Sequence, residues 1–270
     1  MRLAIIAGQG RLPAEMAADW EATQGSAPLI CAVEGMAPEG LRVDRSFRLE
    51  RFSPFLRALG HEGVTHLAMA GATNRVALDP ALLDPATVSF LPRVLPAMQR
   101  GDDALMRALI GVIEDHDLTV LGVQDIAPRL LADAELANAR APDKAEAADA
   151  ARGQEILQAL GTLDIGQGCV VAQGLCLALE ALYGTDAMLD FVARNRPNRR
   201  PEKGGVFIKR AKPGQERRAD LPAIGPQTVL AVQRAGLSGI ALQAGAVVML
   251  DRDEVIARAD AAGIALWSLP

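Results

Sequence analysis

The first third of the chain alternates short apolar runs with segments in which apolar residues recur at helical spacing. The apolar runs lack strict polar–apolar alternation, which is typical of strands buried on both faces; they span residues 3–8, 29–33, 66–72 and 119–123. Helical spacing begins near Pro13, at Ser53-Pro54 and at Asp102 or Asp103. Strands that alternate with helices predict βαβ units, so we expect a Rossmann-like parallel sheet here.

The pattern changes after Asp125. Residues 132–153 are rich in alanine and charge, contain Pro142 and lead into a helix, so we place a domain boundary after residue 134. Beyond it, two apolar strands flank Gly174 and predict a hairpin, and further helices and strands follow to Gly263. The sequence therefore predicts an α/β fold of two domains. Residues 1–134 form the Rossmann-like domain, residues 135–270 form an α/β domain with a mixed sheet, and a ligand site lies in the interdomain cleft.

Composition narrows the classes of function. A formal net charge of −5 and an aromatic content of 3% argue against nucleic-acid binding, which favours basic surfaces and aromatic stacking platforms. Three cysteines without CxxC spacing indicate neither a zinc site nor a disulfide framework. The chain begins without the apolar segment of a signal peptide, and no apolar run reaches the ~18 residues of a membrane span, so we expect a cytoplasmic protein. Peripheral membrane contact stays open.

Positive charge is concentrated between Gly204 and Thr228, where an apolar strand runs into a loop shaped by prolines and glycines. This basic loop surrounds one aspartate, Asp220, with the cations Lys209, Arg210, Lys212, Arg217 and Arg218. Lys and Arg are the side chains that bind phosphate best, and a carboxylate tolerates phosphate when a metal bridges the two. The pattern favours metal-assisted phosphate chemistry; a solvated loop is the alternative.

Polar residues follow three of the predicted strands of the first domain. The carboxyl ends of parallel strands meet at one edge of a sheet, which is where α/β folds bind ligands. The candidates are Gly8, Gln9 and Gly10, then Gly71, Ala72, Thr73 and Asn74, then Gln124 and Asp125. Pro13 stands where a dinucleotide fingerprint needs its third glycine, and the Gly-Lys-Ser/Thr of a P-loop is absent, so neither an NAD nor an ATP signature is present. A tight turn without ligand, and a turn with an Asx-type cap at Asn74, are the alternatives.

Acidic and amide side chains also stand beside glycine turns in the second domain. Gln167 is a candidate ligand there, as are Thr185 and Asp186, although the last two also suit the cap of the following helix. Glu180 ends an apolar strand and suits either a metal ligand or an edge residue.

Several segments together resemble the LpxI family of UDP-2,3-diacylglucosamine pyrophosphatases. They are IIAGQGRLP, LDIGQG, YGTDAM, GGVFIK and, most specifically, KPGQERRADLPAIGPQT. The resemblance covers nearly the whole chain. It implies metal-dependent hydrolysis of UDP-2,3-diacylglucosamine to UMP and 2,3-diacylglucosamine 1-phosphate (lipid X) in lipid A synthesis, by two domains that close over the substrate, with Mg²⁺ or another divalent ion.

By its position in the motif, Asp220 corresponds to the essential aspartate of that family. Two positions depart from the usual pattern: Glu216 replaces an aspartate, and Tyr183 replaces a glutamate, so we leave Tyr183 out of the site. The first-domain candidates, Gln124 included, would hold the UMP portion. The cations Lys209, Lys212 and Arg218 would neutralise the diphosphate, and Asp220 would bind Mg²⁺ or orient the attacking water. Gln215 is a further candidate for substrate binding.

Two other classes of function compete. A non-catalytic nucleotide-sugar-binding protein would use the same residues without depending on Asp220 alone. A Rossmann oxidoreductase or a glycosyltransferase fits only the first half of the chain. Contact with the inner membrane and assembly into a homo-oligomer both stay open.

Overall fold

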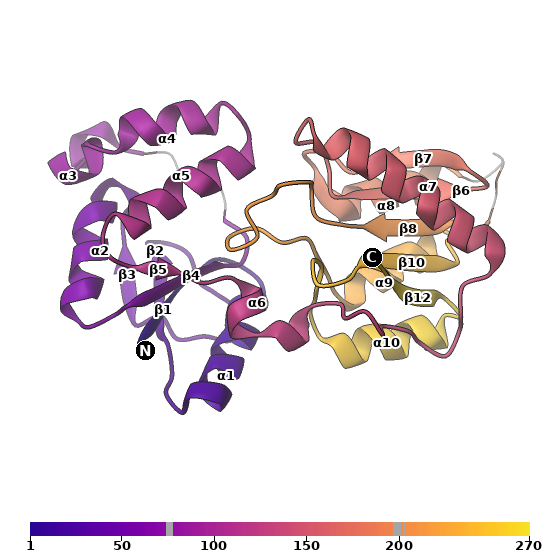
Figure 1. Cartoon of the computed structure of the whole chain (residues 1–270), viewed down its shortest axis with the longest axis horizontal. Helices are drawn as coiled ribbons and strands as arrows, with labels where there is room; N and C mark the ends of the chain where they lie inside the picture. Colours follow the sequence, from indigo (N-terminus) through magenta and orange to yellow (C-terminus); the bar gives the residue numbers. More distant parts are fainter. Residues whose placement is uncertain (74–77, 197–200, 202) are drawn as a thin grey trace. The chain divides into compact units, whose positions relative to one another are not determined.

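The computed structural model describes residues 1–73, 78–196, 201 and 203–270. By their contacts these residues form two compact units, whose elements are labelled in Figure 1. Unit 1 comprises Met1–Pro128 and Glu216–Asp220, and unit 2 comprises Arg129–Gln215 and Leu221–Pro270. The five residues Glu216–Asp220 therefore pack with unit 1, although the chain on either side of them belongs to unit 2.

Unit 1 contains a five-stranded sheet in which every neighbouring pair is parallel, in the order β3-β2-β1-β4-β5. The strands are β1 (Leu3–Ala7), β2 (Leu29–Val33), β3 (Arg45–Phe47), β4 (His66–Ala70) and β5 (Thr119–Val120). The helices are α1 (Leu12–Gln24), α2 (Phe52–His61), α3 (Pro85–Val88), α4 (Leu91–Met98), α5 (Asp102–Glu114) and α6 (Val123–Ile126). The predicted Rossmann-like parallel sheet is confirmed.

Both faces of this sheet are covered, as continuous apolar strands require. On one face, Ala4 of β1 belongs to an apolar cluster with Leu56 of α2 and Ile110 of α5. Side chains alternate along a strand, so its neighbours Leu3 and Ile5 point to the opposite face, and both are fully buried. On that side of the sheet α1 contacts β1 and α6.

One predicted strand is shorter than expected. The run 119–123 forms a strand only at Thr119–Val120, and the chain then turns into the short helix α6. The Asp125 carboxylate accepts a hydrogen bond of 2.8 Å from the Gly122 backbone N–H and so stabilises the start of that helix. Gln124 and Asp125 therefore lie in a helix that follows the strand, and not at the strand's end.

Unit 2 contains a mixed five-stranded sheet in the order β12-β10-β8-β6-β7. The strands are β6 (Gly168–Ala172), β7 (Leu175–Leu179), β8 (Val206–Lys209), β10 (Gly239–Gln243) and β12 (Ala265–Leu269); β9 (Ala223–Ile224) and β11 (Val248–Met249) form a separate parallel pair. Strands β8, β10 and β12 are parallel, whereas β6 and β7 form an antiparallel hairpin beside β8, which confirms the predicted mixed sheet and hairpin. Strand β12, after Gly263, was not predicted.

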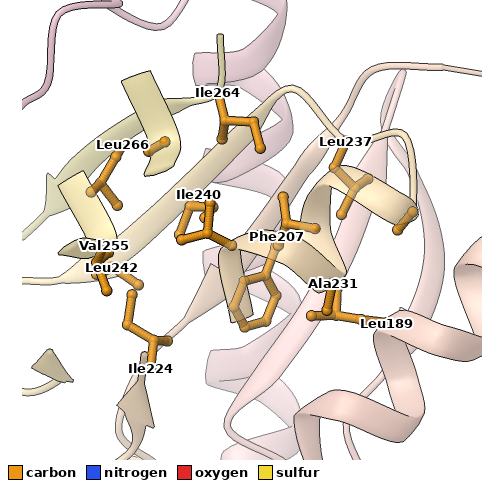
Figure 2. Packing of buried hydrophobic residues seen from close by; sticks show 14 of the residues in the cluster. Leu189, Phe207, Ile224, Ala231, Leu237, Ile240, Leu242, Val255, Ile264 and Leu266 are labelled. Atoms are coloured by element: carbon orange, nitrogen blue, oxygen red, sulfur yellow. The ribbon is translucent and has the colours of Figure 1, made fainter. Parts of the chain in front are cut away.

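Helices cover both faces of the unit 2 sheet; they are α7 (Lys144–Gly161), α8 (Gly184–Asn195), α9 (Pro226–Arg234) and α10 (Arg252–Ala261). Figure 2 shows the face on which Phe207 of β8 packs beside Ile240 of β10, under Leu189 of α8 and Ala231 of α9. On the other face, Ile208 and Cys169 pack against α7. Among the described helices, none is long and apolar enough to cross a bilayer.

We expect Gly8→Ala to destabilise unit 1 by about 1–3 kcal/mol, because a Cβ at Gly8 would lie 2.4 Å from the carbonyl oxygen of Ala72. The two tryptophans lie one in each unit, so urea denaturation followed through Trp20 in a Trp267→Phe background reports on unit 1. Gly60→Ala is the matched control: it meets open space in α2 and should leave stability unchanged or raise it by up to about 1 kcal/mol. Equal changes in the free energy of unfolding for Gly8→Ala and Gly60→Ala would contradict the close approach of Gly8 to the Ala72 carbonyl group.

Candidate functional site

The ends of β1 and β4 in unit 1 are joined by backbone hydrogen bonds. Gly8 N–H donates to Ala70 O at 2.8 Å, and Gln9 and Ala72 exchange hydrogen bonds of 2.7 and 3.0 Å. This approach depends on two glycines, since a Cβ at Gly71 would lie 2.6 Å from the Gln9 carbonyl oxygen. In the order β3-β2-β1-β4-β5 the chain proceeds from β1 through β2 and β3 to one edge of the sheet and then continues with β4 on the other side of β1. Open α/β sheets bind ligands at such a switch point.

The structure brings two predicted groups of residues together at this switch point. Gln9, Gly10, Ala72 and Thr73 are all exposed there, so they are accessible to a ligand. The backbone N–H groups of Gly8 and Gln9, by contrast, are already bonded to β4 and its loop. Asn74 lies outside the described residues.

Gln124 stands in α6, which contacts α1 in unit 1. Its side chain folds back over Gly122, because a Cβ built on Gly122 would lie 2.4 Å from the Gln124 Nε2 atom. The Oε1 atom of Gln124 is buried and has no hydrogen-bond partner among the described residues. Asp125 serves as the cap of α6 described above.

The segment Glu216–Asp220 is held in unit 1 by a charged network around α5. Arg218 Nε and Nη2 donate to the two Glu216 carboxylate oxygens at 2.9 and 2.8 Å, and Arg218 Nη1 donates to Glu114 at 2.7 Å. The Glu216 backbone N–H donates to the Asp103 carboxylate at 2.6 Å. The hydrogen bonds from Arg218, with the charges of Arg218 and Arg107, hold the pKa of Glu216 below its usual 4.5.

Asp220 ends this segment. It is partly exposed, and its backbone N–H lies 3.4 Å from the Glu216 carbonyl oxygen, while the neighbouring Ala219 packs against the apolar cluster of unit 1. In the residues that the structure describes, no three His, Cys, Asp or Glu side chains are grouped so as to hold a metal. A protein cage for an ion is therefore not formed by those residues, whereas one carboxylate that shares Mg²⁺ with ligand phosphates needs no such cage.

In unit 2 the structure brings Lys209 and Thr185 together with a residue that the sequence left undecided, Glu180. Lys209 Nζ, at the end of β8, donates to Glu180 Oε2 at 2.6 Å and contacts Thr185 Oγ1 at 2.6 Å. The Thr185 hydroxyl also donates to Glu180 Oε2 at 2.9 Å. Lys209 and Glu180 are 3% and 9% exposed. Thr185 thus binds this buried ion pair and does not cap α8, whose N-cap residue is Tyr183.

Three of the remaining unit 2 candidates lie on the loops after β8 and before β6, and the fourth, Asp186, lies in α8. Lys212 pairs with Asp164, and its backbone N–H donates to the Gln215 side chain at 2.9 Å. Gln167 has a buried Nε2 atom without a partner among the described residues. Asp186 is exposed in the first turn of α8.

The three cations predicted to bind a diphosphate therefore each contact a carboxylate already. Three of the partner acids lie far away in the sequence: Glu180 for Lys209, Asp164 for Lys212 and Glu114 for Arg218. The second acid that Arg218 contacts, Glu216, stands two residues before it. No local pattern around the basic loop indicates the pairs with Glu180, Asp164 and Glu114. The one available signal was Glu180, an acid that ends an apolar strand.

Comparison with known proteins identifies relatives of the whole chain. The model of the LpxI N-terminal domain matches residues 2–130, and that of the LpxI C-terminal domain matches residues 133–267. The chain is also 36% identical, over 273 aligned residues, to the UDP-2,3-diacylglucosamine pyrophosphatase LpxI of Caulobacter vibrioides. That alignment covers 97% of this chain and 95% of the relative.

The depressed pKa of Glu216 predicts a pH dependence of unit 1 stability. A carboxylate whose pKa is lower in the folded state stabilises the fold above its unfolded pKa, near 4.5, and loses this contribution as the pH falls through the folded pKa. We expect Glu216→Gln to be less stable than the wild type at neutral pH and the difference to shrink below pH 4.5. Urea denaturation through Trp20 measures it, with Glu34→Gln at an exposed surface pair as control. If the difference in stability between Glu216→Gln and the wild type did not change with pH, the stabilising role of the Glu216 carboxylate would be contradicted.

Lys209→Met should lower the free energy of unfolding of unit 2 by about 3–5 kcal/mol, because it leaves the buried Glu180 carboxylate without its cation. A second substitution, Glu180→Gln, should restore part of the loss by removing that charge. Urea denaturation through Trp267 in a Trp20→Phe background follows unit 2. Arg152→Met is the control, since its exposed pair with Glu155 should contribute at most about 1 kcal/mol. An unchanged stability in Lys209→Met would show that Lys209 is not held by Glu180.

Proposed function

The chain belongs to the LpxI family, and from this membership we propose that it hydrolyses the pyrophosphate bond of UDP-2,3-diacylglucosamine in lipid A synthesis. The products would be UMP and 2,3-diacylglucosamine 1-phosphate. The observation that carries the proposal is the match of both family domains, together with an aligned relative of that name over nearly the full chain.

We propose that Asp220 carries the chemistry. Glu216 and Arg218 fix the segment on which it lies, so its carboxylate is presented from a defined backbone, which favours the orientation of an attacking water. A partly exposed carboxylate also suits Mg²⁺, which binds through one or two carboxylates and substrate phosphates. When bound, the ion would lower the pKa of a coordinated water and offset negative charge on the phosphates.

The pairing of the cations supports metal dependence. Lys209, Lys212 and Arg218 each contact a carboxylate, so a diphosphate that relied on these three cations alone would have to compete with those acids. A divalent ion at Asp220 removes that competition by bringing two positive charges with the substrate.

We propose that the switch point of unit 1 binds the UMP portion. The exposed side chains of Gln9 and Thr73 provide amide and hydroxyl groups that can hydrogen-bond a base or ribose, and they stand at the edge where such sheets bind nucleotides.

Incubation of the chain with UDP-2,3-diacylglucosamine and Mg²⁺ should release UMP, and EDTA should stop the release. Asp220→Ala should slow it by about 10²- to 10⁴-fold while substrate binding is largely kept, because the residue acts on the reacting groups. Asp253→Ala, at an exposed carboxylate of α10, is the matched control and should keep full activity. UMP release by Asp220→Ala at the wild-type rate would reject the role of Asp220. Absence of release by the wild type would favour a non-catalytic nucleotide-sugar-binding protein.

A further inference from the structure

Arg210 directly follows β8 and Gln167 directly precedes β6, and the two residues stand opposite each other. The Arg210 backbone N–H donates to the Gln167 carbonyl oxygen at 2.9 Å, which continues the antiparallel register of Gly168 with Lys209. Directly opposed residues of an antiparallel pair have Cβ atoms roughly 4.5–5.5 Å apart and side chains on one face of the sheet. The two side chains are therefore neighbours.

The face that these side chains share is the one covered by α7. Cys169 and Ile208, two residues farther along each strand, pack in the cluster beneath that helix. Arg210 itself donates from Nη1 to the carbonyl oxygen of Gln154 in α7 at 3.3 Å. Lys209 points the other way, to Glu180 beside α8, so the pair of Arg210 and Gln167 is separate from the buried ion pair.

Both side chains carry donors that the described residues leave unbonded. Arg210 Nε and Gln167 Nε2 are buried and have no hydrogen-bond partner among the residues that the structure describes. Within the described part of the chain, Arg210 forms no ion pair, unlike Lys209, Lys212 and Arg218. Burial also lowers the pKa of the Arg210 guanidinium. A half-buried cation beside an unbonded amide donor is unfavourable unless an acceptor, best an anion, completes the site.

Arg196, also in unit 2, shows how the same chain satisfies a buried guanidinium when its role is structural. It donates to four carbonyl oxygens, at 2.8 Å to Pro201, 3.0 Å to Ala235, 3.3 Å to Gly236 and 2.5 Å to Gly204. Among the described residues, the Arg210 side chain makes a single hydrogen bond, at the long end of the range. The difference separates a guanidinium that ties the fold together from one whose donors remain available.

We propose that Arg210 and Gln167 form an oxyanion-binding site in unit 2 that receives a phosphoryl group. Guanidinium and amide N–H groups together match the oxygens of a phosphate. The site lies at the carboxyl end of β8, beside Gln243 at the end of the parallel strand β10, whose side chain accepts a 3.1 Å hydrogen bond from Ala211 N–H. The choice of a phosphoryl group as the oxyanion rests on the proposed function, because the proposed substrate and both products carry phosphate.

The test compares stability and phosphate binding in three variants of the full chain, followed through Trp267 in a Trp20→Phe background. Inorganic phosphate at matched ionic strength should shift the wild-type urea transition upward, since a ligand that binds only the folded state stabilises it. In Arg210→Met that shift should vanish, and phosphate affinity should fall at least about tenfold. Without phosphate, Arg210→Met should be as stable as the wild type or more so, because methionine keeps the apolar stem and removes the unpaired charge.

Arg196→Met serves as the matched control: it should destabilise unit 2 and keep the phosphate-induced shift. Asp220→Ala should also keep the shift, so that a failure of the proposed hydrolysis and a failure of the anion site are distinguished. Acetate in place of phosphate should give a smaller shift. A phosphate-induced shift that persists in Arg210→Met, or that is absent from the wild type, would overturn the proposal.

Discussion

The arrangement of the candidate catalytic segment depends on the carboxylate of Glu216. The segment Glu216–Asp220 forms neither a strand nor a helix, so no ladder of backbone hydrogen bonds fixes it. Within the segment, the Arg218 guanidinium donates two parallel hydrogen bonds to the Glu216 carboxylate. The segment is joined to α5 by the Glu216 backbone N–H, which donates to the Asp103 carboxylate, and by Arg218 Nη1, which donates to Glu114. A bidentate pair of this kind fixes the direction of the Arg218 guanidinium, so that its third donor meets Glu114 and the segment that ends at Asp220 is held against unit 1.

The architecture was largely readable from the sequence, because burial on both faces and helical spacing leave local marks. The parallel strands of unit 1, the hairpin at Gly174 and the mixed sheet followed from such marks, and the resemblance to the LpxI family is confirmed by both family domains. Elements without those marks were missed: β3 is three residues long and mostly exposed, and α6 begins where an apolar run suggested that a strand continued.

The ion pairs of the candidate site could not be predicted from the sequence in the same way. The sequence shows a surplus of cations around Asp220, but whether a cation is available depends on acids that the fold brings from elsewhere. Arg218 meets Glu114 from 104 positions away, and Lys212 meets Asp164 from 48 positions away. Lys209 looked like a phosphate ligand and is buried with Glu180, whereas Arg210, next to it, faces the other side of the sheet and has no ion pair among the described residues. Consecutive side chains along an extended chain point to opposite faces of the sheet, which is why these two neighbouring cations have different surroundings.

The membership of Glu216–Asp220 in unit 1 has a consequence for biosynthesis. A chain made from its N-terminus presents Met1–Pro128 long before it presents the five residues that unit 1 still needs. At a synthesis rate of about 5–20 residues per second, the delay is roughly 5–18 s, during which the Glu114 carboxylate of α5 lacks its partner Arg218. The nascent protein can therefore assemble its sheet early, while the segment that carries Asp220 docks only after most of unit 2 has been translated.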